Sequence, residues 1–222
     1  MKKVFLSICC MSLLAISLIS VSCNKDSKDS DNGSGGSFVI TAKNVIGDDD
    51  EIANVEAFVA NYNGNIYKIA SDQYKNNGFQ LTLPATVPNE SLWSMYELGC
   101  IDDLVNHTNA QTTIMGMLAF DGEGARIGSF WLADFESGVL VSYLYADRNF
   151  SVKGYDCDDW KWDCTFKKGW NEVYYNHELT TTQKPSGTNL QWCFMELGSG
   201  DYLKTNPLLS YHKKMFTFAP VK

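Results

Sequence analysis

The sequence predicts an all-β protein whose body, residues 38–222, is an antiparallel β-sandwich-like domain. Two observations support this fold class. From Phe38 onward, apolar residues recur mostly at every second position, which is the period of a strand with one buried face. Glycine, asparagine and aspartate interrupt these stretches about every 8–12 residues, a spacing typical of sandwiches and barrels. A barrel with an apolar interior, of the lipocalin kind, is the alternative architecture.

The first part of the body contains predicted strands joined by short polar turns. The strands cover residues 38–42, 55–60, 66–70 and 79–83. An acidic turn is expected at residues 47–51 and a second turn at residues 61–65. The Asn-Asn-Gly sequence at residues 76–78 predicts a turn of the Asn-Gly kind. Pro84 ends the strand that follows it.

The strand pattern continues after one irregular segment. Residues 89–106 are the least strand-like and predict a loop with a short helical turn, and a subdivision of the body is placed near residues 89–110. Residues 198–211 predict a long loop before the last strand. The strands of this part cover residues 112–120, 125–132, 138–145, 150–155, 160–166, 170–175, 190–196 and 215–218.

The first 37 residues have the pattern of an export signal followed by a tether. Lys2 and Lys3 precede an apolar run, and small residues then lead to Cys23, which is typical of a secretory signal peptide over residues 1–22. A membrane-spanning helix is the alternative, but the run contains serines and has about 18 residues, the low end for a span. Residues 24–37 contain only Asn, Lys, Asp, Ser and Gly. Because these residues cannot bury apolar area, residues 23–37 predict a flexible tether.

The sequence Leu-Ile-Ser-Val-Ser before Cys23 resembles the lipobox of bacterial lipoproteins. Ser20 stands where that family usually has Leu, Val or Ile, so the match is closest to the relaxed boxes of Bacteroidetes lipoproteins. The resemblance implies that the Cys23 thiol is diacylated, that the chain is cut just before it, and that the partner is the lipid bilayer. A single acyl chain binds a membrane only marginally, whereas two or three chains hold firmly.

Other parts of the chain resemble small, uncharacterised surface lipoproteins of Bacteroidetes. The acidic Lys/Asp/Ser tract after Cys23 is similar to their surface-export signal, and residues 67–84 and 166–175 are similar to stretches of their bodies. This resemblance implies an outer-membrane protein at the cell surface with a β-sandwich-like body. A periplasmic spacer is the alternative interpretation of the tract. No catalytic residue is carried over.

Net charge limits the class of partner. The chain carries −8, and removal of residues 1–22 takes away Lys2 and Lys3, so the mature chain carries −10. Nucleic acid and anionic lipid headgroups both require clustered lysine and arginine. The sequence therefore argues against both as partners.

Four cysteines remain in the mature body: Cys100, Cys157, Cys164 and Cys193. An exported protein can form disulfides, and four thiols allow three pairings. The first expectation is a local bridge between Cys157 and Cys164 together with a bridge between Cys100 and Cys193. Buried free thiols are the alternative. The spacing does not fit a zinc site.

Trp160 and Trp162 are the most suggestive candidate binding residues. On a strand their rings share one face and could form a flat platform for sugar rings, with Asp158 and Asp159 bonding hydroxyl groups. The alternative is that the tryptophans fill the core, which is the commoner role of aromatic residues on one strand face.

Evidence for catalysis and for metal binding is thin in the sequence. His107, His177 and His212 lie in no metalloprotease context, and Asp134 with Glu136 suits a polar turn better than a carboxylate pair. No cofactor is expected. Calcium on residues 48–51 or 156–163 is a weak alternative, because neither segment has the EF-hand order.

The function predicted from the sequence is a non-enzymatic, membrane-anchored module that binds a glycan, protein or other extracellular ligand. Three alternatives stay open: a structural or adhesive component of a surface assembly, a carboxylate-based hydrolase, and a lipocalin-like carrier of a small ligand.

Overall fold

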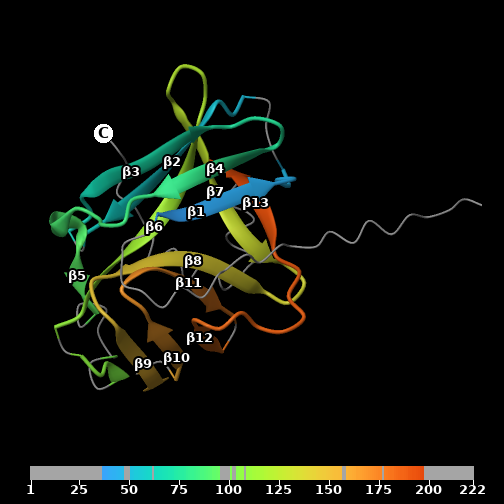
Figure 1. The fold of residues 1–222 in the computed structure, drawn as a ribbon. Coiled ribbons are helices and arrows are strands. Elements are labelled where there is room, and N and C mark those ends of the chain that lie inside the picture. Colours follow the sequence, from blue (N-terminus) through green and yellow to red (C-terminus); the bar gives the residue numbers. More distant parts are fainter. Residues whose placement is uncertain are drawn as a thin grey trace, which may run out of the picture. The chain divides into compact units, whose positions relative to one another are not determined.

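The computed structural model describes residues 37–47, 51–61, 63–95, 101, 104–107, 109–156, 159–176 and 178–197. Strands dominate this part of the chain, and none of its residues is α-helical. The predicted fold class, an antiparallel β-sandwich-like body, is confirmed (Figure 1).

The strands lie close to where the two-residue period predicts them. The first are β1 (Phe38–Lys43), β2 (Asn54–Ala60), β3 (Ile66–Gln73) and β4 (Gly78–Leu83). After the 3-10 helix η1 (Asn89–Ser91) come β5 (Trp93–Ser94), β6 (Gln111–Phe120), β7 (Arg126–Asp134), β8 (Val139–Ala146), β9 (Phe150–Tyr155), β10 (Lys161–Phe166), β11 (Gly169–Tyr175), β12 (Leu179–Thr181) and β13 (Gln191–Glu196). β5 and β12 were not predicted, because two or three residues are too few to show a period. Residues 48–50 and the predicted elements at 198–211 and 215–218 lie outside the described residues.

The strands of the described residues form two sheets. β1 pairs with β4 in a two-stranded sheet, with Phe38 opposite Leu83. The second sheet has 11 strands in the main order β3-β2-β6-β7-β8-β11-β12-β10-β9, with β13 on β7 and β5 on β6. All pairs are antiparallel except β10 with β12. In Figure 1, β1 and β4 lie side by side, and β9, β10 and β12 gather at one end of the body.

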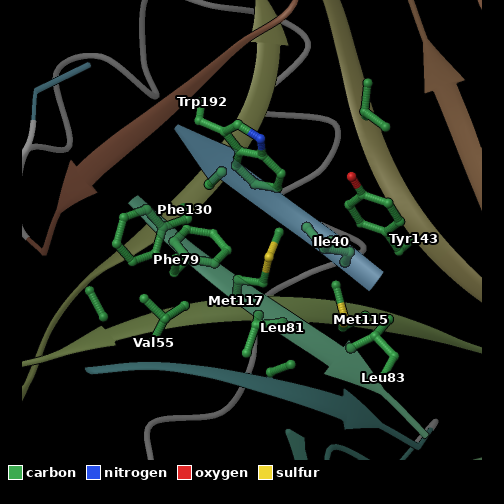
Figure 2. Close-up of a cluster of buried hydrophobic side chains, with 14 of the residues drawn as sticks. Ile40, Val55, Phe79, Leu81, Leu83, Met115, Met117, Phe130, Tyr143 and Trp192 are labelled. Carbon is green, nitrogen blue, oxygen red and sulfur yellow. The ribbon is translucent and has the colours of Figure 1, made fainter. Parts of the chain in front are cut away.

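Two large clusters of buried side chains hold the body together. The first lies between the two-stranded sheet and the large sheet, where Ile40 and Leu81 meet Met115 and Met117 (Figure 2). The second packs residues of the 89–110 segment, including Trp93 and Val105, against β8 to β11. That segment is also tied to the large sheet by the pairing of β5 with β6 and by a bridge from Val105 to Val152.

The predicted turn at residues 76–78 is confirmed, but Asn76 and Asn77 form its centre in place of an Asn-Gly pair, and the strands that it joins, β3 and β4, belong to different sheets. Lys75 and Gly78 exchange both backbone hydrogen bonds, at 3.0 and 3.1 Å. Asn76 and Asn77 occupy the two central positions with φ of 52° and 53°, as a type I′ turn requires. Gly78 is already the first residue of β4.

Candidate functional site

The candidate site is a cavity where strands β6, β7 and β8 exchange partners. The first part of β6, Thr112 to Met115, pairs with β8, and its end pairs with β7. The end of β7 in turn pairs with β8 through Leu132 to Asp134. The middle of β6 is therefore paired with neither β7 nor β8, and the three strands enclose a triangular opening.

This opening contains a cavity of about 80 Å³. A cavity needs a volume of roughly 10–15 Å³ to hold one water molecule, so this cavity has room for several waters or for a small organic group. The wall is formed by Met115, Gly116, Met117, Leu118, Arg126, Ser129, Phe130, Trp131, Val141, Ser142 and Tyr143. Figure 2 shows Met115, Met117, Phe130 and Tyr143 as members of the adjoining core, so one side of the wall is apolar.

Arg126 is the charged residue of the wall. It is the first residue of β7, beside an irregularity in the pairing of β6 with β7 at Ala119 and Phe120. Its Nε is buried and has no hydrogen-bond partner among the described residues. Burial lowers the pKa of this guanidinium, since desolvation disfavours the charged form.

Arg148, the other arginine of the chain, forms an ion pair with a carboxylate, as arginines commonly do. Its Nε and Nη2 donate to both carboxylate oxygens of Asp147, at 2.7 to 3.1 Å. This ion pair raises the pKa of Arg148 through the hydrogen bonds. No ion pair among the described residues includes Arg126. The chain thus supplies an anionic partner, Asp147, for Arg148, whereas no described residue supplies one for Arg126.

Two serines and a tyrosine add polar groups to the wall. Ser129 Oγ accepts a hydrogen bond of 2.9 Å from Trp131 Nε1, which leaves its own hydroxyl proton able to donate. Ser142 is buried, at 6% exposure. Tyr143 is buried too. Its burial, and to a smaller extent the nearby charge of Glu172, raises the pKa of Tyr143 well above the usual value for tyrosine. Its phenol therefore stays protonated near neutral pH.

The predicted tryptophan platform is wrong. Trp162 is only 6% exposed and lies on the face of β10 that carries Cys164 and Phe166 into the second core cluster. Trp160 is half-buried against the same cluster, and its Nε1 donates to Thr180 Oγ1 at 2.7 Å. The physical reason is that the 89–110 segment covers this face of the strand, so the rings fill the core.

The acidic residues near these tryptophans hold the turn between β9 and β10. Asp156 accepts hydrogen bonds from Trp160 N at 2.9 Å and from Trp162 Nε1 at 3.0 Å. Asp159 is exposed in the same turn, with φ of 58°. Asp158 lies outside the described residues.

Asp134 and Glu136 belong to the turn between β7 and β8, as the sequence indicates. Asp134 is buried and accepts hydrogen bonds from Ser137 Oγ at 2.6 Å, from Asn189 N at 3.0 Å and from Glu136 N at 3.1 Å. These hydrogen bonds lower the pKa of Asp134, and the bond from the Ser137 hydroxyl has the largest effect. The carboxylate therefore fixes the turn and the segment before β13.

Cys164 and Cys193 are buried free thiols in the structure. Cys164 Sγ donates to Thr180 O at 3.4 Å, and Cys193 Sγ donates to Gln191 O at 3.6 Å. This differs from the two bridges expected first, because both side chains point into packed surroundings. It agrees with the alternative of free thiols for these two residues. Their expected partners, Cys157 and Cys100, lie outside the described residues.

Several other candidate residues are not described by the structure: Cys23, Asp48, Asp49, Asp50, His177 and His212. His107 is described and is exposed. Within the described ranges, the acidic, histidine and cysteine side chains form no group of three that could hold a metal ion. The same ranges contain no helix that is long and apolar enough to cross a membrane.

The sequence did not single out Arg126. Its one available signal was rarity, since the chain has two arginines and only one of them, Arg148, is next to an acidic residue. The exchange of pairing partners among β6, β7 and β8 forms the cavity, and the alternation of apolar and polar residues in the sequence does not predict this exchange. Comparison of the chain with protein-family models, with curated proteins and with solved structures gives no match.

Proposed function

We propose that this protein is a non-enzymatic binding module, anchored to the outer membrane through acylated Cys23 and exposed at the cell surface, that captures a small extracellular ligand in the cavity at β6, β7 and β8. The anchor rests on the signal-like residues 1–22 and on the resemblance to the lipobox. The observation that carries the binding function is the buried Nε of Arg126 in a cavity wall, with no partner among the described residues.

A buried guanidinium nitrogen without a hydrogen-bond partner costs stability, so Arg126 Nε favours a bound ligand that restores the hydrogen bond. The cavity also has the composition of a small-molecule site, with a mostly apolar wall and a few polar groups. A sugar ring on Trp160 and Trp162 is no longer part of the proposal, because Trp162 is buried.

The chemistry of the wall supports binding over acid–base catalysis. Arg126 and Tyr143 are the wall residues with titratable protons. A general acid or base works best when its pKa lies near the operating pH. Arginine stays charged in proteins, and burial moves the pKa of Tyr143 away from neutrality. The proposal therefore assigns the cavity to recognition.

A ligand screen with a cavity-filling variant tests this function. The full-length chain in detergent would be screened by thermal shift against small acids, amines, amides and sugars, in parallel with Ser142→Leu. We expect a compound that stabilises the native chain and not this variant, because leucine at position 142 would take up space in the cavity. Ser151→Leu is the matched control, because Ser151 is half-buried on β9, away from the cavity wall, and this variant should still be stabilised by the compound. If no compound distinguishes Ser142→Leu from this control, the cavity is not a binding site.

A further inference from the structure

We propose that the ligand of this cavity carries one carboxylate on a short apolar stem, and that the guanidinium of Arg126 binds the carboxylate side-on through Nε and an adjacent Nη. This inference rests on the proposed function and adds the chemical class of the ligand.

The first reason is the shape of the unsatisfied group. The Nε proton and one Nη proton of a guanidinium point in parallel and match the two oxygens of a carboxylate. In this chain Arg148 binds Asp147 in this way, with Nε donating to Oδ1 at 3.1 Å and Nη2 donating to Oδ2 at 2.7 Å. Arg126 leaves its Nε without a partner among the described residues, in the cavity wall. The same fork is therefore available to a carboxylate from outside the chain.

The second reason is the balance of charge in the wall. Arg126 is the one charged residue among those that line the cavity. A monoanion would neutralise it, whereas a dianion such as hydrogen phosphate would leave one charge uncompensated in a partly desolvated site, which is costly. A neutral amide or sugar would leave the half-buried cation without a counter-charge. A single carboxylate fits best.

The third reason is the composition of the rest of the wall. Aliphatic and aromatic side chains form most of it, and Met115 and Met117 adapt well to varied apolar groups. Ser129 and Ser142 place hydroxyl groups in the same wall, where a carboxylate oxygen could accept from them. About 80 Å³ limits the stem to a few carbon atoms.

Nuclear magnetic resonance on arginine side chains tests this directly, because the chain has only two arginines. Full-length protein labelled with ¹⁵N-arginine would be titrated with butyrate, butyramide and inorganic phosphate, while the two Nε–H resonances are followed. We expect butyrate to shift the Arg126 resonance in a saturable way and to leave the Arg148 resonance unmoved. Butyramide and phosphate should bind about 10- to 100-fold more weakly, as expected for loss of a charge-assisted pair.

Two variants complete the test. Arg126→Lys keeps the charge but lacks the fork, so butyrate affinity should fall about tenfold or more, while Arg148→Lys should leave it unchanged. Equal binding of butyrate and butyramide, equal binding of butyrate and phosphate, or equal shifts of both arginines would overturn the carboxylate assignment. If the screen yields a neutral ligand that Ser142→Leu abolishes, the binding function stands and this inference fails. If nothing distinguishes Ser142→Leu from Ser151→Leu, both fail.

Discussion

Asp134 shows at the scale of one residue how a buried carboxylate can be structural. It accepts hydrogen bonds from the backbone and side chain of the turn that follows β7 and from Asn189 N, far along the chain. The bonds favour the ionised form, which is why its pKa is lowered. The turn and the segment before β13 thus share one acceptor.

The lowered pKa predicts that Asp134 contributes to acid sensitivity. Its stabilisation is complete above the ordinary aspartate pKa of 3.8 and is lost as the pH falls through the lower folded value. We therefore expect Asp134→Asn to lower the free energy of unfolding at pH 7 and to have a smaller effect at pH 2. Urea unfolding at both pH values measures this, and an equal loss at both would contradict the assignment. Exposed Glu123→Gln is the control and should change little.

Cys164 gives a second prediction at this scale. Burial raises its pKa to about 12, and burial likewise raises that of Cys193 to about 11. Because the thiolate is the reactive form, iodoacetamide at pH 8 should label both thiols slowly in the native chain and rapidly in urea. Peptide mass spectrometry of the two labelled samples measures this. Rapid native labelling of Cys164 would show that its site is open.

The same shift makes Cys164 one of the groups that lower stability at alkaline pH. Since the folded pKa of Cys164 is raised above the ordinary value of 9.0, its contribution is present in full below pH 9 and is lost as the pH rises towards about 12.

At the scale of the element, the turn between β3 and β4 depends on a glycine for reasons of space. A Cβ on Gly78 would lie 2.3 Å from the carbonyl oxygen of Ala42, which belongs to the paired strand β1. The obstacle is backbone, so it cannot rotate away. The type I′ turn and the β1–β4 pairing therefore meet at this one residue.

We expect Gly78→Ala to lower the free energy of unfolding by about 1–3 kcal/mol, the cost typical of overpacking. Gly122→Ala, in the exposed hairpin between β6 and β7, is the matched control, because a Cβ added at Gly122 would meet no described residue within 4 Å beyond its chain neighbours. Denaturant unfolding of the two variants gives the comparison. Similar losses in both would mean that the clash at Ala42 is relieved without cost.

The end of β9 and start of β10 is the element where sequence and structure differ most. The alternation of Trp160 and Trp162 with aspartates and lysine was a correct signal of a strand face. Whether that face was open or covered depended on residues near Trp93 and Val105, about 60 positions earlier in the chain.

At the scale of the whole molecule, the anchor is the feature that decides where the proposed binding site would be held. We expect wild-type protein to fractionate with the outer membrane and Cys23→Ala to lose its acylated N-terminal peptide and membrane association. Cys164→Ala is the control, since this thiol is buried in the body. Mass spectrometry of the N-terminal peptide and membrane fractionation give the answer. An unchanged acylated peptide in Cys23→Ala would refute the anchor.

The sequence by itself determined the fold class, the positions of most strands and the turn at residues 76–78. These properties are local: a period of two and a pair of asparagines act within a few residues. Only the tertiary structure decided that Trp162 is covered, that two candidate thiols are buried, and that β6, β7 and β8 part around a cavity whose wall includes Arg126. Those properties depend on which distant strands pair and which faces become covered. The residues that make such contacts lie far apart in the sequence, so the local pattern around each of them does not predict the contact.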